Sequence, residues 1–303
     1  MSRRLFDCFL FNAELDLLEF RLDLLADVVD RHVLVEAPRT YSGAAKPLHF
    51  AENAHRFARH ADRIIHVVVD DLPMPDLGLA GRWAPELFQR RAISRGLTEA
   101  GGDDLILLCD VDEIPDPAVL AAVVERLAQP AAMEMPLSFL RANWISAVPW
   151  TLPRVAPVGS FDDLQQLRID EPALLVRAAG CHFSYLMDDA EISRKMRDNA
   201  HVEFDTPVFT DPDFLQACTA GAVFPLTSEL LTVAGPESLT AVQTALLTAR
   251  PDAFLFDGVP PEWERRTLAA YARRRQSALL PTPVRRALDV GSRRLLNRGR
   301  GGQ

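Results

Sequence analysis

The sequence lacks the cross-links that hold small secreted proteins together. Its 303 residues include four cysteines, and their spacing matches neither a disulfide framework nor a zinc site. Cys8 and Cys109 lie inside apolar runs that are typical of buried strands, where cysteine behaves as a small hydrophobic side chain in a reducing compartment. The composition, 48% hydrophobic and 25% charged, is that of an ordinary globular protein.

Long apolar segments and excess positive charge are also missing. No run is long enough to cross a membrane, and Asp7 interrupts the apolar stretch after the basic start, so we expect a strand there and no signal peptide. The net charge of -9 argues against nucleic acid as a partner. Nearly every basic residue is an arginine, and the lysines are Lys46 and Lys195. This bias is typical of a GC-rich bacterial genome. We expect a cytoplasmic protein.

Apolar runs and amphipathic segments alternate along the first part of the chain. We expect strands at 5–9, 32–35, 64–69 and 105–110, and helices at 15–29, 50–62, 85–100 and 117–128. This alternation predicts an α/β fold with a doubly wound, mainly parallel sheet. We expect a nucleotide-sugar-binding and catalytic domain over 1–212, a C-terminal helical extension packed on it over 213–280, and a basic, flexible tail over 281–303.

The most informative motif is the Asp-Val-Asp-Glu segment at 110–113, which directly follows a short apolar run. Ligands of open α/β sheets bind outside the carboxyl ends of the strands. Carboxylates crowded at such a place repel one another unless a cation lies among them, and Mg²⁺ or Mn²⁺ is the ion that carboxylates and substrate phosphates bind together. Asp116 before Pro117 is a usual helix start, but capping does not explain the acids before it. We predict a metal-diphosphate site at Asp110 and Asp112.

Arg90 lies on the apolar stripe of the helix expected at 85–100. Its neighbours on that stripe at helical spacing are Glu86, Ile93 and Leu97. A cation facing the sheet needs an anion, and Glu86 or the diphosphate of a bound nucleotide would serve. The spacing does not decide between the two.

Four sequence blocks, in order, resemble glycosyltransferase family 17. They are Phe6-Asp7-Cys8-Phe9 with residues 12–22; Val35-Glu36-Ala37-Pro38-Arg39-Thr40-Tyr41-Ser42-Gly43; residues 64–73 followed by Phe88-Gln89-Arg90 and the acidic motif; and Gly180-Cys181-His182-Phe183-Ser184-Tyr185-Leu186 followed by His201-Val202-Glu203-Phe204. The blocks span about the first two thirds of the chain, which is domain-sized. Cys181, Arg91 and the stretch 133–157 depart from the family's pattern, which leaves the acceptor open.

The resemblance implies a GT-A enzyme that uses a nucleotide sugar and, usually, a divalent metal. Asp112 would then bind the metal directly, and Asp110 would contact the ribose or a metal-bound water. Asp7 and Glu36 are expected at the ends of the first two strands, where GT-A enzymes bind the nucleotide, so that Asp7, Glu36 and Arg39 become donor-site candidates. For Glu36 and Arg39 the alternative is ordinary turn chemistry around Pro38 and Gly43.

The same resemblance draws attention to late histidines and acids. GT-A folds often bring one late histidine to the metal, and His182, in a short strand-like segment, is our candidate, although a lone histidine is more often structural. Glu203, two residues after His201, is the leading candidate for the general base, with Asp188 and Asp189 as rivals.

These features lead to a metal-dependent, inverting glycosyltransferase that moves N-acetylglucosamine from a UDP-sugar to a glycan acceptor hydroxyl. A phosphohydrolase or phosphotransferase with Asp110 as nucleophile also fits an apolar strand followed by Asp-x-Asp, but three strands precede this one and the acidic pair comes before Lys195. The carboxylates are too close together for a glycosidase. A non-catalytic module that binds a sugar nucleotide stays an alternative.

The last segment of the chain differs in charge from the rest. From Pro281 onward nearly every charged residue is an arginine, with leucines at 288, 295 and 296 among them. A solvated, weakly ordered terminus is one interpretation. The other is a basic amphipathic helix that rests on anionic lipid, which would place the protein at the inner face of the membrane.

Overall fold

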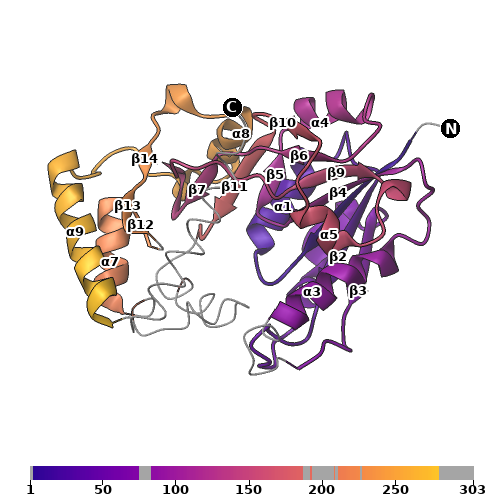
Figure 1. The fold of residues 1–303 in the computed structure, drawn as a ribbon, viewed down its shortest axis with the longest axis horizontal. Helices are drawn as coiled ribbons and strands as arrows, with labels where there is room; N and C mark the ends of the chain where they lie inside the picture. Colours follow the sequence, from indigo (N-terminus) through magenta and orange to yellow (C-terminus); the bar gives the residue numbers. More distant parts are fainter. Residues whose placement is uncertain are drawn as a thin grey trace. The chain divides into compact units, whose positions relative to one another are not determined.

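The computed structural model describes residues 3–74, 83–186, 192, 208, 211–225 and 227–279. The chain divides into two compact units (Figure 1). Unit 1 comprises Met1–Met135 and Thr151–Cys181, and unit 2 comprises Pro136–Trp150 and His182–Gln303. This division differs from the predicted boundaries at 212 and 280.

Unit 1 is a mixed α/β structure built on a seven-stranded sheet in the order β10-β6-β9-β4-β1-β2-β3. These strands are β1 (Leu5–Leu10), β2 (Arg31–Glu36), β3 (Ile64–Val68), β4 (Leu105–Asp110), β6 (Ala131–Met133), β9 (Arg154–Pro157) and β10 (Leu174–Val176). β1 pairs in parallel with β2 and β4, β2 with β3, and β6 with β10, whereas β9 runs antiparallel to β4 and β6. The mainly parallel sheet is confirmed.

The helices of unit 1 are shorter than the sequence predicts. They are α1 (Leu15–Leu24), α2 (His49–Glu52), α3 (Ala84–Arg91), α4 (Pro117–Val124) and α5 (Leu164–Ile169), with the 3-10 segments η1 (Ala54–His60), η3 (Ala92–Gly96) and η4 (Val158–Ser160). The helix expected at 50–62 is divided between α2 and η1, and the one at 85–100 between α3 and η3. Asp116 caps α4 as predicted, because its side chain accepts from two main-chain N–H groups of the first turn.

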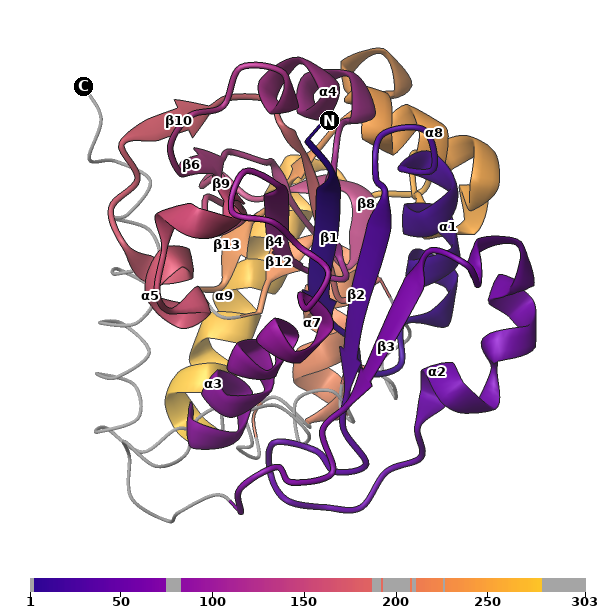
Figure 2. The same ribbon diagram turned by 90° about the vertical axis from the view of Figure 1, so that its right-hand side faces the viewer.

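Helices cover both faces of the sheet, and α1 and α3 lie on different sides of it (Figure 2). Alternate side chains of β1 point to opposite faces. Phe6 and Cys8 belong to a core that includes Ile93 of η3, while Phe9 packs with Leu18 of α1 in another core. Asp7, between Phe6 and Cys8, therefore faces the α1 side. It is fully buried inside the strand, whereas the sequence prediction placed it at a strand end.

Unit 2 combines short strands with helices. Its elements are β7 (Leu137–Phe139), β8 (Arg141–Ile145), the end of β11 (Gly180–Ser184), α7 (Pro212–Gly221), β12 (Val223–Phe224), β13 (Glu229–Leu230), β14 (Thr232–Val233), η5 (Pro236–Ser238), α8 (Ala241–Ala249), η6 (Pro251–Ala253) and α9 (Glu262–Leu279). Phe214 and Cys218 of α7 share a core with Ala269 and Ala272 of α9. The expected helical character after residue 213 is confirmed. In the described parts of the chain, no helix combines the length and apolarity needed to span a membrane.

Candidate functional site

The acidic segment lies where β4 ends. Asp110 is the last residue of β4, and Glu113 begins the short strand β5 (Glu113–Pro115), so a two-residue turn joins the strands. The Asp110 side chain is 33% exposed, whereas Asp112 and Glu113 are buried. Because β4 pairs with β1 in parallel, this turn lies at the carboxyl edge of the sheet. The predicted placement of the motif is confirmed.

Two arginines hold the carboxylates of this turn. Arg168 of α5 donates from Nη2 to Asp110 Oδ2 at 2.7 Å and to Glu113 Oε1 at 2.6 Å, and from Nη1 to Glu113 Oε2 at 3.0 Å. Arg90 of α3 donates from Nη2 to Asp110 Oδ1 at 3.0 Å and from Nη1 to Glu86 Oε1 at 2.9 Å. Both arginine side chains are 3% exposed. Protein cations therefore already balance Asp110, one of the two carboxylates predicted to bind a metal ion, and its neighbour Glu113.

The structure shows one of the two partners that the spacing of Arg90 left open. Glu86, the structural partner, is bonded to it as expected, and Asp110 is a second partner that the sequence did not predict. Arg90 is therefore next to the acidic turn, so the prediction that it contacts a bound diphosphate stays geometrically reasonable. Arg91 and Arg95 form exposed ion pairs with Asp163 and Asp71, as expected for residues on the solvated face.

A third arginine contacts the main chain of the turn. Arg21 of α1 donates from Nη1 to the carbonyl oxygens of Glu113 at 2.6 Å, Val111 at 3.3 Å and Asp110 at 3.4 Å. Its other edge holds Asp7, with Nη2 to Oδ1 at 2.5 Å and Nε to Oδ2 at 2.9 Å. The Arg21 side chain has no exposed surface.

The expected position of Asp7 at a strand end is wrong. Asp7 lies in the middle of β1, has no exposed surface, and accepts from Arg21 and from Nδ1 of His32 at 2.9 Å. The apolar run continues past it to Phe11, which is why the strand is longer than predicted. This geometry gives Asp7 a structural place inside the sheet.

The buried ion pair makes Asp7 an unusually strong acid. Burial by itself would raise its pKa, but the charge and hydrogen bonds of Arg21, with those of His32, lower the pKa from 3.8 to about 2. Because the folded-state pKa is lowered, the contribution to stability is complete above pH 3.8 and is lost as the pH falls towards 2. A shift of this size corresponds to about 2 kcal/mol.

Glu36 and Arg39 lie near the end of β2, as predicted. Glu36 is the last residue of the strand and is fully buried, with Oε1 accepting from the main-chain N–H of Phe50 at 3.0 Å and Oε2 lying 3.2 Å from His66 Nε2. Arg39 is exposed and donates to the sulfur of Met74 at 3.0 Å. These contacts explain the local structure of the segment, and the donor-binding roles of both residues stay predictions.

Tyr41 is close enough to the acidic turn to be affected by its charge. Burial raises the pKa of the Tyr41 phenol well above its usual value, the Glu86 carboxylate raises it further, and Asp110 adds to the effect against Arg90. The phenol is therefore protonated at neutral pH and can donate a hydrogen bond. The sequence analysis did not single out this residue, although it lies in the second family-like block.

The remaining site candidates lie in unit 2 or outside the described residues. His182, on β11 in unit 2, is buried, and its ring centroid is 4.7 Å from that of Trp150. Asp188, His201 and Glu203 lie outside the described residues. The metal role of His182 and the base roles of Glu203 and Asp188 therefore stay predictions.

The donor set fits a metal that depends on its substrate for ligands. Over the described stretches of the chain, no cluster of three or more His, Cys, Asp or Glu side chains is placed to hold a metal ion. Mg²⁺ and similar ions often use one or two carboxylates and complete their coordination with water and substrate phosphates. Asp112 stays the predicted direct ligand of such a site, and Asp110 is held by Arg90 and Arg168.

Sequence reasoning missed Arg21 and Arg168. Arg21 had a signal, since it lies three residues after Leu18 and four before Leu25 on the apolar stripe of α1, where a cation must be paired. Arg168 had none, because it approaches the turn from an element 55 residues further along the chain.

Comparison with known proteins agrees with the family resemblance of the four sequence blocks. The sequence model of glycosyltransferase family 17 matches residues 1–218, which include every described residue of the acidic turn. The chain is 29% identical over 153 residues to the beta-1,4-mannosyl-glycoprotein 4-beta-N-acetylglucosaminyltransferases of Rattus norvegicus and Homo sapiens, and 28% identical to that of Mus musculus. Each match covers 48% of this chain and 28% of the relative, so the similarity spans less than a third of the relatives' length.

Proposed function

Because the family model covers most of its length, the chain belongs to glycosyltransferase family 17, and we propose that it transfers N-acetylglucosamine from a UDP-sugar to a hydroxyl group of a glycan acceptor. The observation that carries this proposal is the acidic turn at the carboxyl edge of a mainly parallel sheet, inside the matched region. The printed activity of the relatives supports the choice of sugar. The same sheet and turn support assignment to the GT-A type.

The leaving group of this reaction is a nucleoside diphosphate, which gains negative charge as the sugar departs. Bound Mn²⁺ or Mg²⁺ would supply positive charge to that group. Asp112 would hold the metal, and Arg90 and Arg168 keep Asp110 in a fixed orientation beside it. Tyr41, protonated at neutral pH, can donate a hydrogen bond near the same place.

The acceptor hydroxyl must lose a proton as it attacks the anomeric carbon. For inversion in one displacement, a carboxylate takes this proton, and we assign the role to Glu203, with Asp188 as the rival. Glu36 and Arg39, near the end of β2, would contact the nucleotide. The metal role of His182, which lies in unit 2, rests on the family resemblance alone.

The test is release of UDP. The purified protein is incubated with UDP-N-acetylglucosamine and Mn²⁺, with and without oligosaccharide acceptors, and free UDP and elongated glycan are measured. We expect UDP release that increases with acceptor, and loss of it in Asp112→Asn. Binding of the sugar nucleotide without turnover would favour a non-catalytic module. Phosphate release from simple phosphomonoesters would favour a phosphohydrolase with Asp110 as nucleophile.

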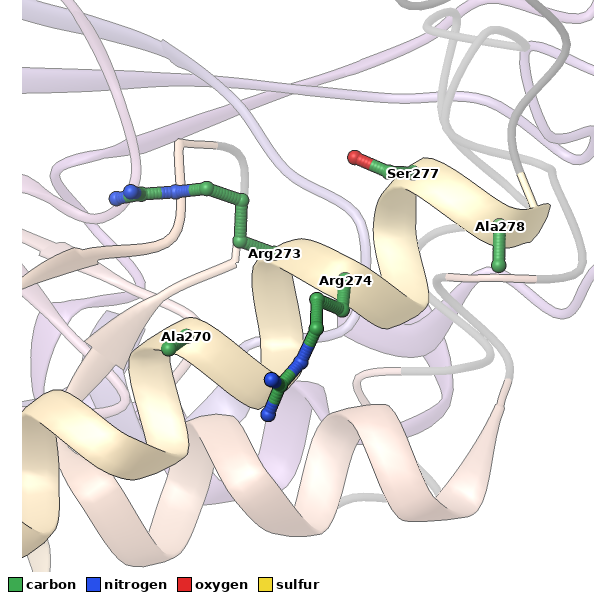
Figure 3. A pocket seen from close by; sticks show the side chains of 5 residues that line it. All are labelled: Ala270, Arg273, Arg274, Ser277 and Ala278. Carbon is green, nitrogen blue, oxygen red and sulfur yellow. The ribbon is translucent and has the colours of Figure 1, made fainter.

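We also propose that the protein is cytoplasmic and that its arginine-rich end contacts anionic membranes. In α9, Arg273 and Arg274 are exposed, and with Ala270, Ser277 and Ala278 they line an open surface pocket (Figure 3). These arginines extend the positive charge of residues 281–303, and each cation near an anionic surface contributes about 1 kcal/mol. The test compares sedimentation with anionic and neutral vesicles for the full chain and a truncation after residue 280. Equal binding of both forms to anionic vesicles would refute the proposal, and UDP release should not differ between them.

A further inference from the structure

Arg21 connects the interior of the sheet with the main chain of the acidic turn. It lies on α1, its guanidinium has no exposed surface, and it stacks over the ring of Phe9 with its central carbon 4.9 Å from the ring centroid. One edge of the guanidinium holds both oxygens of Asp7, and the other edge donates to carbonyl oxygens of the turn. Burying a charge is costly unless it is paired and hydrogen-bonded, and Arg21 has one carboxylate partner and several carbonyl partners.

We propose that Arg21 is a positioning residue for the transfer reaction proposed above: held by Asp7, it fixes the peptide planes of the acidic turn and so the directions of the carboxylates of Asp110 and Asp112. The inference rests on that proposed function for its catalytic meaning. Its structural part, that Arg21 orders the turn, stands by itself and is measured separately.

The geometry of the turn shows how such control would operate. The carbonyl of Glu113 accepts from Arg21 at 2.6 Å, while its side chain is held from a different helix by Arg168. The main-chain N–H of Asp110 donates to Glu113 Oε2 at 2.7 Å. The turn is therefore fixed through its main chain by Arg21 and through its side chains by Arg168. Arg21 therefore acts on carbonyl oxygens of the turn, and Arg168 acts on its carboxylates.

The support of Arg21 extends through three elements. His32 of β2 contacts Asp7 of β1 through Nδ1 at 2.9 Å, and the two residues are direct neighbours in the parallel register. Asp7 in turn holds Arg21 of α1 in a bidentate pair, the geometry in which arginine is most strongly oriented. Lysine cannot replace this fork, because its single ammonium group cannot contact both Asp7 oxygens and the carbonyls of the turn together.

The experiment must separate positioning from folding. Single removal of Arg21 or Asp7 leaves a buried charge, so the main variant is the double change Asp7→Asn with Arg21→Met, which removes both charges and keeps a polar partner for His32. The matched control is Arg4→Met with Asp104→Asn, an ion pair between residues just before β1 and β4, at the opposite end of the same two strands.

The first readout is amide hydrogen exchange of the ligand-free protein. We expect exchange at residues 110–113 to be at least about tenfold faster in the Asp7/Arg21 variant, with residues 106–108 unchanged, and no such effect in the control. If the double variant does not melt cooperatively, Arg21→Lys, which keeps the charge, is measured in the same way. Exchange at 110–113 equal to that of the wild type in the variant that folds would overturn the inference.

The second readout is the affinity for UDP with Mn²⁺, measured by calorimetry, together with kcat and KM. Loss of a group that orients metal ligands typically costs about 10–100-fold in metal affinity, and we expect a loss in that range. Wild-type affinity in the variant would refute the catalytic part. If the wild type itself neither binds UDP with Mn²⁺ nor releases UDP, the proposed function fails, and hydrogen exchange still decides whether Arg21 orders the turn.

Discussion

Replacing Arg168 by Met should destabilise unit 1 more than any change at an exposed ion pair. Arg168 donates three hydrogen bonds of 2.6–3.0 Å to Asp110 and Glu113, and its side chain is 3% exposed. Glu113 has no exposed surface, so it keeps its charge in the interior but loses the cation that balances it. Asp110, one third exposed, can recover part of its loss through water.

The magnitude follows from these burials. Removing one partner of a buried pair costs about 3–5 kcal/mol, and the part of the interaction made by Asp110, which is one third exposed, adds little. Domains have a total stability of about 5–15 kcal/mol, so the loss is a large fraction of it. For a unit of this size each kcal/mol lowers the melting temperature by about 2–4 °C, which predicts a fall of about 10 °C.

The assay is urea and thermal unfolding followed by near-ultraviolet circular dichroism. Arg91→Met is the control, because Arg91 forms a 2.6 Å ion pair with Asp163 and its side chain is 57% exposed; we expect a change within about 0.5 kcal/mol. Adding Glu113→Gln to Arg168→Met should recover most of the loss, since the buried Glu113 charge that lost its partner is then removed as well. An unchanged unfolding midpoint for Arg168→Met, or losses that add in the double variant, would refute the reasoning.

Three further predictions concern the acidic turn, the base and the backbone. Asp112→Asn should abolish transfer while circular dichroism shows an intact fold; near-normal turnover would remove Asp112 from the site. Glu203→Gln should lower kcat by about 10²–10⁴ with donor affinity kept, and Asp188→Asn should be mild; the reverse order would exchange their roles. Gly180→Ala should lower the melting temperature strongly, because φ is +148° and a Cβ would lie 2.2 Å from a main-chain oxygen of β5, whereas Gly102→Ala, with open space around it, should not.

The strands and the acidic turn could be predicted because their signals are local. The run 105–109 is apolar throughout, so it indicates a strand buried on both faces, and the first polar residue after it marks the carboxyl end. The ends of helices were less predictable. Leu25 and Val29 continue the apolar stripe of α1 and are buried, but the helix stops at Leu24. Periodicity reports which side chains are buried, and it does not report which main-chain groups are hydrogen-bonded.

The ion pairs of the site could not be predicted, because their partners come from separate elements. Asp7 was expected at a strand end, where GT-A enzymes bind the nucleotide. Its actual place inside an apolar run is costly for a carboxylate. Arg21, 14 residues later on α1, removes that cost, and only the packing of α1 on β1 reveals the pair. Arg168 contacts Glu113, which lies 55 residues earlier in the chain. Long-range charge pairing is therefore what local patterns fail to report in this chain.

The arginines change what the acidic turn requires of a bound metal. Crowded carboxylates need a cation, but Arg90 and Arg168 already balance Asp110 and Glu113. These two guanidinium groups are already engaged with carboxylates, so they offer an incoming diphosphate little positive charge. A divalent ion bound with the diphosphate would supply that charge. We therefore expect UDP affinity, measured by calorimetry, to fall strongly in excess EDTA while the unfolding midpoint stays unchanged, and equal UDP affinity with and without chelator would show that the protein's own arginines suffice.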